Sequence, residues 1–67
     1  MEYTNSRIRE IIAEYVHSSR DRSVMEKRYI DGLTFEKLAE VHELSVSQVK
    51  RIIKKNAAVI FRHMDIN

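Results

Sequence analysis

Residues 38–53 read LAEVHELSVSQVKRII, which has the pattern of two short helices joined by a tight turn. A helix-turn-helix motif needs a small residue where its two helices approach most closely, and Ala39 meets that need. The apolar side chains expected inside the turn and on the inner side of the second helix are Leu44, Val49 and Ile52. The pattern predicts a helix-turn-helix motif over about residues 35–54.

The boundary of the second helix is indicated by a local signal. Ser45 and Gln48 have the S-x-x-Q spacing of a capping box, in which each side chain accepts a hydrogen bond from the other residue's backbone N–H. The helix is therefore expected to begin directly after Ser45. Glu43 stands where a glycine would be most comfortable in such a turn, and a left-handed glutamate costs roughly 1 kcal/mol. The sequence leaves the exact shape of the turn open.

The rest of the chain is also patterned for helices, and its 67 residues are expected to form a single all-α domain. There is no proline, and the only glycine, Gly32, stands where a helix would end in a left-handed residue. Four helices are predicted, at about residues 5–17, 20–30, 35–42 and 46–64. Apolar residues recur along them at three- and four-residue steps: Ile8, Ile11, Ile12, Tyr15, Val16, Val24, Met25, Tyr29, Phe35, Leu38, Ala39, Val49, Ile52, Ile53, Ala57, Ile60, Phe61 and Met64.

Charge is sorted between the predicted helices. Residues 1–32 contain six basic and six acidic side chains, whereas residues 46–63 contain five basic and no acidic ones. A helix this positive is expected of a surface that faces a polyanion. The charge pattern alone leaves open the alternative that these lysines and arginines only form a solvated face.

Just over half of the chain resembles region 4 of bacterial sigma-70-type factors, over residues 20–55: RDRSVMEKRYIDGLTFEKLAEVHELSVSQVKRIIKK. The pieces that carry the resemblance are V-M-x-x-R-Y, Y-I-D-G-L-T-F-E-K-L-A and L-S-V-S-Q-V-K. The segment is similar above all to the small extracytoplasmic-function subfamily and to short regulators of phages and mobile elements. The resemblance implies a sequence-reading DNA-binding domain that acts in transcription, with RNA polymerase as a further partner.

The resemblance also implies that the DNA-contacting side chains lie at the start of the fourth helix and one turn further on. Arg51 can bind O6 and N7 of guanine, Ser47 can bond to a base edge, and Val46 can meet a thymine methyl group. Lys54 and Lys55 lie further along, so phosphate contact is expected of them. With the amide end of the third helix added as a phosphate site, the candidate residues are Thr34, Val46, Ser47, Gln48, Lys50, Arg51, Lys54 and Lys55.

The sequence gives no support for an enzyme. It has no nucleophile and base at a diagnostic spacing and no glycine-rich phosphate loop. The three histidines are expected in separate helices without carboxylates at metal-ligand spacing, so neither a metal nor a cofactor is expected: His17, His42 and His63. No run approaches the ~20 apolar residues of a membrane span. With no cysteine and no signal peptide, a cytoplasmic, nucleoid-associated protein is expected.

A helical interaction or dimerisation module that does not read DNA is the alternative. The first helix and residues 57–66 lie outside the sigma-like segment, and both are apolar. We expect them to pack against each other within one chain, or else to bury a shared seam in a homodimer that binds an inverted repeat with half-sites ~34 Å apart. Since no counterpart of the DNA-melting sigma region is present, a regulator or accessory subunit is expected rather than a complete sigma factor.

Overall fold

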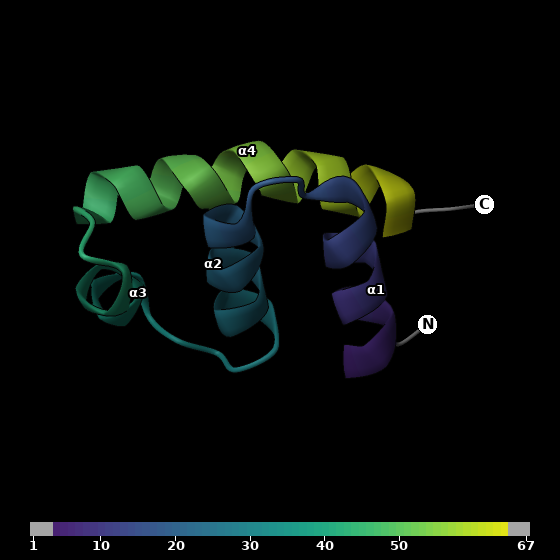
Figure 1. Ribbon diagram of the computed structural model, residues 1–67, viewed down its shortest axis with the longest axis horizontal. Coiled ribbons are helices and arrows are strands. Elements are labelled where there is room, and N and C mark those ends of the chain that lie inside the picture. Colours follow the sequence, from purple (N-terminus) through teal and green to yellow (C-terminus); the bar gives the residue numbers. More distant parts are fainter. Residues whose placement is uncertain (1–3, 65–67) are drawn as a thin grey trace.

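The computed structural model describes residues 4–64, which form four helices: α1 (Asn5–Tyr15), α2 (Ser19–Tyr29), α3 (Phe35–His42) and α4 (Val46–Met64). There is no strand among the described residues, so the prediction of an all-α fold is confirmed. α4 runs along one side of the molecule, and α3, α2 and α1 pack against it in that order from its N-terminal to its C-terminal end (Figure 1). The three short helices thus pack side by side along the length of α4.

Each of the four helices begins directly after a hydroxyl residue that caps its start. The caps of the three short helices, whose side chains each accept a hydrogen bond from the backbone N–H three residues later, are Thr4, Ser18 and Thr34. At α4 the predicted capping box is confirmed, because the Gln48 N–H donates to Ser45 Oγ at 3.1 Å and the Ser45 N–H donates to Gln48 Oε1 at 2.9 Å. Each cap satisfies backbone donors that a helix start otherwise leaves without a partner.

The turn between α3 and α4 is built on a left-handed glutamate. Glu43 has φ 56° and ψ 47°, and it is the one non-glycine residue with a positive φ in the described part of the chain. Its N–H donates to the Glu40 carbonyl at 3.4 Å, while the Leu44 N–H donates to the Ala39 carbonyl at 2.9 Å. These two bonds form a Schellman motif, which normally places glycine at this position. The turn therefore keeps the shape of the motif at the cost of a strained glutamate.

α1 ends two residues earlier than predicted. Val16 adopts an extended conformation with φ −107° and ψ 112°, so His17 lies between α1 and α2 and not within a helix. The Arg22 guanidinium donates to the carbonyls of Val16 and His17 at 2.9 and 3.1 Å. This contact from the next helix satisfies two carbonyls that the end of α1 leaves without a helical partner, and Ser18 then caps α2.

The core lies between α4 and the three short helices. Its buried apolar side chains all come from predicted apolar positions: Ile11, Ile12, Val16, Val24, Met25, Leu38, Ala39, Val49, Ile52, Ile53 and Ile60. Two other predicted positions stay exposed, Tyr29 at 37% and Phe61 at 49%, and their rings pack edge to face with centroids 5.8 Å apart. They contact each other at the margin of the core, where none of the other helices in residues 4–64 covers them. The Met64 side chain and residues 65–67 lie outside the described part of the chain. Over residues 4–64, none of the helices combines the length and the apolar character that crossing a membrane requires.

Candidate nucleic-acid interface

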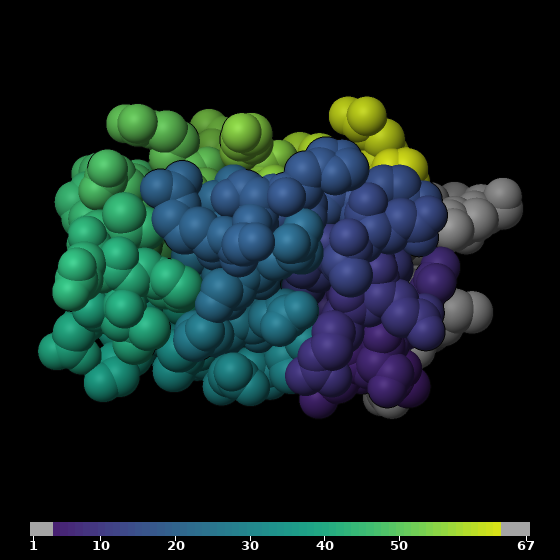
Figure 2. Space-filling view, in the orientation of Figure 1, coloured from purple at the N-terminus to yellow at the C-terminus, as the bar shows by residue number. Residues whose placement is uncertain are grey.

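α4 has a buried side and an exposed side. The buried side carries the core residues Val49, Ile52, Ile53 and Ile60, together with Asn56. On the opposite side, exposed residues recur at three- and four-residue steps and form a stripe, because an α-helix turns once every 3.6 residues. We call this set the outer stripe, and it comprises Ser47, Arg51, Lys54, Ala58 and Arg62. In Figure 2, α4 follows one edge of the molecule while α1, α2 and α3 occupy the face below it.

The predicted site residues of α4 are distributed around its exposed side. Three of them, Ser47, Arg51 and Lys54, lie on the outer stripe and are exposed. Lys50 and Lys55 are also exposed, but five residues separate them, which places them on opposite flanks of the stripe. A helix inserted into a groove would therefore present one lysine toward each wall.

Three further predicted residues are engaged in local structure. Gln48 is exposed, and its side-chain oxygen is occupied by the capping bond, so its NH₂ group remains as a donor. Val46 is half-buried and packs against the core, so only part of its side chain faces outward. Thr34, at the N-terminus of α3, is exposed and uses its hydroxyl as the cap.

Cations from α2 and α4 meet beside the start of α3. The Arg28 guanidinium lies 4.5 Å from the centroid of the Phe35 ring, and Lys50 Nζ lies 5.7 Å from it. Both distances are within the ~6 Å range of a cation–π contact. Arg28 also donates to the Leu33 carbonyl at 2.8 Å, which holds the loop that leads to Thr34. The amide end of α3, proposed as a phosphate site, thus has two cations close to it.

Arg28 was missed as a candidate, because sequence spacing does not show which side chain reaches a loop. Its position within V-M-x-x-R-Y was the available signal.

The basic side chains of α4 are not neutralised within the part of the chain that the structure describes. Ion pairs among residues 4–64 join other cations, namely Arg7 to Glu10, Arg20 to Asp21 and Lys37 to Glu40. None of them involves a lysine or arginine of α4. The positive charge of the helix is therefore available to an external anion.

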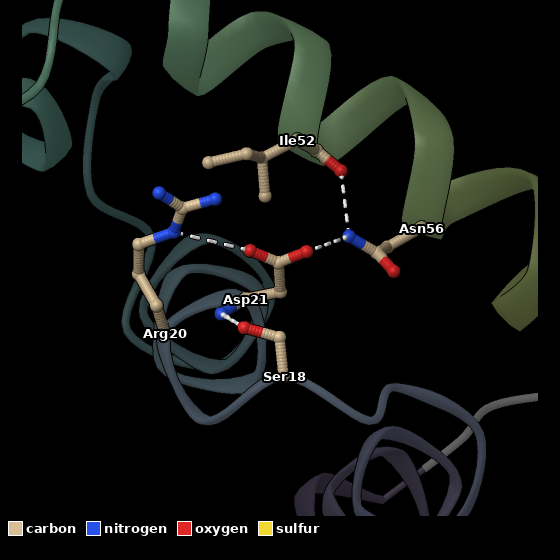
Figure 3. A network of polar contacts seen from close by, with 5 residues as sticks. All are labelled: Ser18, Arg20, Asp21, Ile52 and Asn56. Carbon is tan, nitrogen blue, oxygen red and sulfur yellow. Dashed lines mark hydrogen bonds and ion pairs between the residues drawn. The ribbon is translucent and has the colours of Figure 1, made fainter.

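A buried polar pair between α2 and α4 was also missed. Asp21 and Asn56 are 6% and 7% exposed, and Asn56 Nδ2 donates to Asp21 Oδ2 at 3.2 Å (Figure 3). The sequence did hold a signal, since Asn56 falls on the apolar side of α4 between Ile52 and Ile60. Its partner lies 35 residues away, so the pairing itself could not be read from spacing.

One histidine lies in an unusual environment at the end of α3. His42 Nε2 is buried and has no hydrogen-bond partner among the described residues. Burial lowers the pKa of His42 below its ordinary value of 6.5, and the positive charges of Lys27 and Arg20 lower it further. The imidazole is therefore neutral near pH 7. Residues 4–64 contain no group of three or more His, Asp or Glu side chains that could hold a metal ion.

Comparison with models of known protein families gives a match that includes the candidate interface. The family model described as "Sigma-70, region 4" matches residues 18–57, which is well over half of the chain. The match begins at the cap of α2 and ends within α4, so it includes α2, α3, the turn at Glu43 and every candidate residue of the interface. Comparisons with curated proteins and with solved structures give no match.

Proposed function

We propose that this chain, which belongs to the sigma-70 region 4 family of DNA-binding helix-turn-helix domains, is a sequence-specific regulator of bacterial or phage transcription. The family is one of regulatory domains and not of enzymes. The observation that carries the proposal is the exposed and unneutralised positive charge of α4, on the helix that follows the turn. Such a protein would act in the cytoplasm, at the nucleoid.

In the proposed complex the N-terminal half of α4 lies in the major groove. The groove is about 12 Å wide, and 19 residues make a helix about 28 Å long, so only part of α4 fits between the groove walls. The first two turns of the outer stripe, with Ser47 and Arg51, would face base edges. Arg51 suits guanine, to which its guanidinium can donate two hydrogen bonds.

Phosphate contacts would hold the helix in place from both sides. Lys50 and Lys55 lie on opposite flanks of α4 and would each meet the phosphates of one groove wall. On the Lys50 side, Arg28 and the free amides at the start of α3 next to Thr34 offer a second contact to the same strand. Lys54 would reach a phosphate beyond the base-contacting turns.

The experiment that tests the proposal is selection of bound duplexes from a random library, followed by anisotropy titration on the selected and on a scrambled duplex. A regulator of this kind should enrich a short motif and bind it on the order of 10³-fold more tightly than the scrambled sequence. No enrichment by a folded sample would overturn sequence-specific reading. An enriched inverted repeat would indicate two copies on one site, whereas a single half-site would indicate one.

The alternative function, an interaction or dimerisation module, has one supporting observation. Tyr29 of α2 and Phe61 of α4 form a partly exposed aromatic pair. The apolar surfaces of α1 and of the end of α4 that a homodimer would have to share are largely buried within the chain. Ile11, Ile12 and Ile60 are buried together, and Tyr15 stacks on His63 with ring centroids 3.6 Å apart. We therefore propose a single chain as the DNA-binding unit, with RNA polymerase as a second partner to be tested by pull-down with the purified enzyme.

A further inference from the structure

We propose that the buried hydrogen bond between Asn56 and Asp21 sets the orientation of α4 against α2 and thereby the base preference of the outer stripe. The inference rests on the proposed function, since it concerns how the same helix reads DNA. It assigns a positioning role to two residues that do not touch DNA themselves.

The pair is the polar centre of an otherwise apolar contact between α2 and α4. Asn56 Nδ2 donates to Asp21 Oδ2 at 3.2 Å and to the Ile52 carbonyl within its own helix at 2.9 Å. The other carboxylate oxygen, Oδ1, accepts from Arg20 Nε at 3.3 Å. Figure 3 shows Asp21 between Arg20 on one side and Asn56 on the other. Because the Arg20 side chain is 55% exposed, Asn56 is the partner that reaches Asp21 from inside the protein.

Apolar contacts alone define the orientation of α4 loosely. The buried positions nearest to Asn56 are Ile52, Ile53 and Ile60, and contacts between such apolar side chains are non-directional. A small rotation of the helix would bury a similar apolar area. The hydrogen bond is directional, and losing it would leave a largely buried carboxylate without its inner partner. The polar pair therefore penalises rotations that the apolar core would tolerate.

A small rotation matters on the opposite side of the helix. Side-chain atoms at the surface of an α-helix lie about 5–6 Å from its axis, so a rotation of roughly 10° moves them by about 1 Å. Binding groups have to be held within about 0.5 Å of their productive geometry. Arg51 lies five residues before Asn56, on the outer stripe, and its two bonds to a guanine would be lost first. Phosphate contacts by flexible lysines would persist.

The test compares base preference with overall affinity. Asn56→Leu keeps the branched shape of asparagine and its number of side-chain heavy atoms but donates no hydrogen bond. We expect the ratio of affinities for the selected and the scrambled duplex to fall on the order of tenfold, as for loss of one base contact. Affinity for the scrambled duplex and the salt dependence should stay as in the wild type, because the cations are unchanged.

Control variants separate positioning from stability. Ile60→Val shortens a buried side chain of the same helix without polar change, so it should lower stability and keep the affinity ratio. Asp21→Asn keeps an oxygen that can accept from Asn56 and should also keep the ratio. If Asn56→Leu does not fold by circular dichroism, Asn56→Ser replaces it, since its hydroxyl can bond to the Ile52 carbonyl but is too short to reach Asp21.

Three outcomes would overturn the inference: an unchanged ratio in Asn56→Leu, an equal fall in Ile60→Val, or an equal fall in Asp21→Asn. The last would assign the effect to the charge of Asp21 and not to the hydrogen bond. Failure of the proposed function is distinguishable, because it appears in the wild type alone as equal affinity for the selected and the scrambled duplex, before any variant is compared.

Discussion

At the scale of single residues, different side chains of α4 are proposed to contact bases and phosphates. Arg51 lies on the outer stripe near the start of the helix, whereas Lys55 lies on one flank. We predict that Arg51→Ala weakens binding to the selected duplex by ~1–3 kcal/mol and relaxes base preference, while Lys55→Ala weakens binding to every duplex alike. Anisotropy titrations on selected and scrambled duplexes measure both effects. Equal losses on the two duplexes for Arg51→Ala would contradict its base-reading role.

His42 makes a second residue-scale prediction, about stability against pH. Its pKa is lowered in the folded protein by burial and then by Lys27 and Arg20, so below pH 6.5 the unfolded chain binds more protons than the folded one. Protonation of His42 therefore does not reduce the free energy of unfolding above pH 6.5. The free energy of unfolding falls as the pH drops through 6.5 toward the lower pKa of the folded state. We predict that urea unfolding from about pH 7.5 to about pH 5.5 shows a steeper loss of stability in the wild type than in His42→Gln.

The matched control is the exposed His17, for which His17→Gln should reproduce the wild-type pH dependence. If His42→Gln lost stability between the two pH values as steeply as the wild type, protonation of His42 would not be the cause.

At the scale of elements, a local signal predicted the start of α4, and tertiary contacts decided other boundaries. Ser45 and Gln48 form a cap whose two partners lie three residues apart, so spacing alone identified it. The end of α1 depends on Arg22, which reaches back from the next helix, and spacing could not show that contact. The exposure of Phe61 likewise depends on how the other helices pack against α4, which the apolar pattern of one helix does not show.

In the candidate interface, too, some residues could be predicted from local signals, and others are identified only by tertiary contacts. Its α4 residues could be proposed from the motif and from charge, because both are properties of one helix. Arg28 and the pair of Asp21 and Asn56 could not, since each acts across two elements. What the sequence hides is therefore the set of contacts that orient α4, while the side chains on its exposed side are open to prediction.

The turn between α3 and α4 yields a prediction at this scale. Glu43 is left-handed, a conformation that costs a non-glycine residue roughly 1–2 kcal/mol. Glycine removes that strain but adds roughly 0.4–1 kcal/mol of unfolded-state entropy. Glu43→Gly should therefore raise the free energy of unfolding by about 0.5–1 kcal/mol in urea denaturation.

Two controls accompany the turn prediction. Glu43→Ala removes the charge and keeps the strain, so it should stay close to the wild type. Gly32→Ala places a side chain at φ 75° and should cost about 1 kcal/mol, although nothing lies within 4 Å of the added Cβ. Destabilisation by Glu43→Gly relative to Glu43→Ala would show that the turn is built in another way.

At the scale of the whole molecule, the three short helices leave one side of α4 open and charged. Counterion release then makes affinity for DNA steeply dependent on salt, with a slope of log K against log salt of about −0.9 for each phosphate neutralised. If the phosphate contacts are those of Arg28, Lys50, Lys54 and Lys55, the slope should be about −3.6. Raising the salt fourfold should then weaken binding by roughly 150-fold.

The slope also reports on single contacts, because removing one phosphate contact should reduce its magnitude by about 0.9. Anisotropy titrations of the wild type and Lys55→Ala across a salt series measure this difference directly. Arg7→Ala is the matched control, since Arg7 lies on α1, which packs against the C-terminal end of α4, and is paired with Glu10 at 3.3 Å. A flat response in the wild type would mean that the exposed cations of α4 do not meet phosphates, and the interaction module would then explain them better.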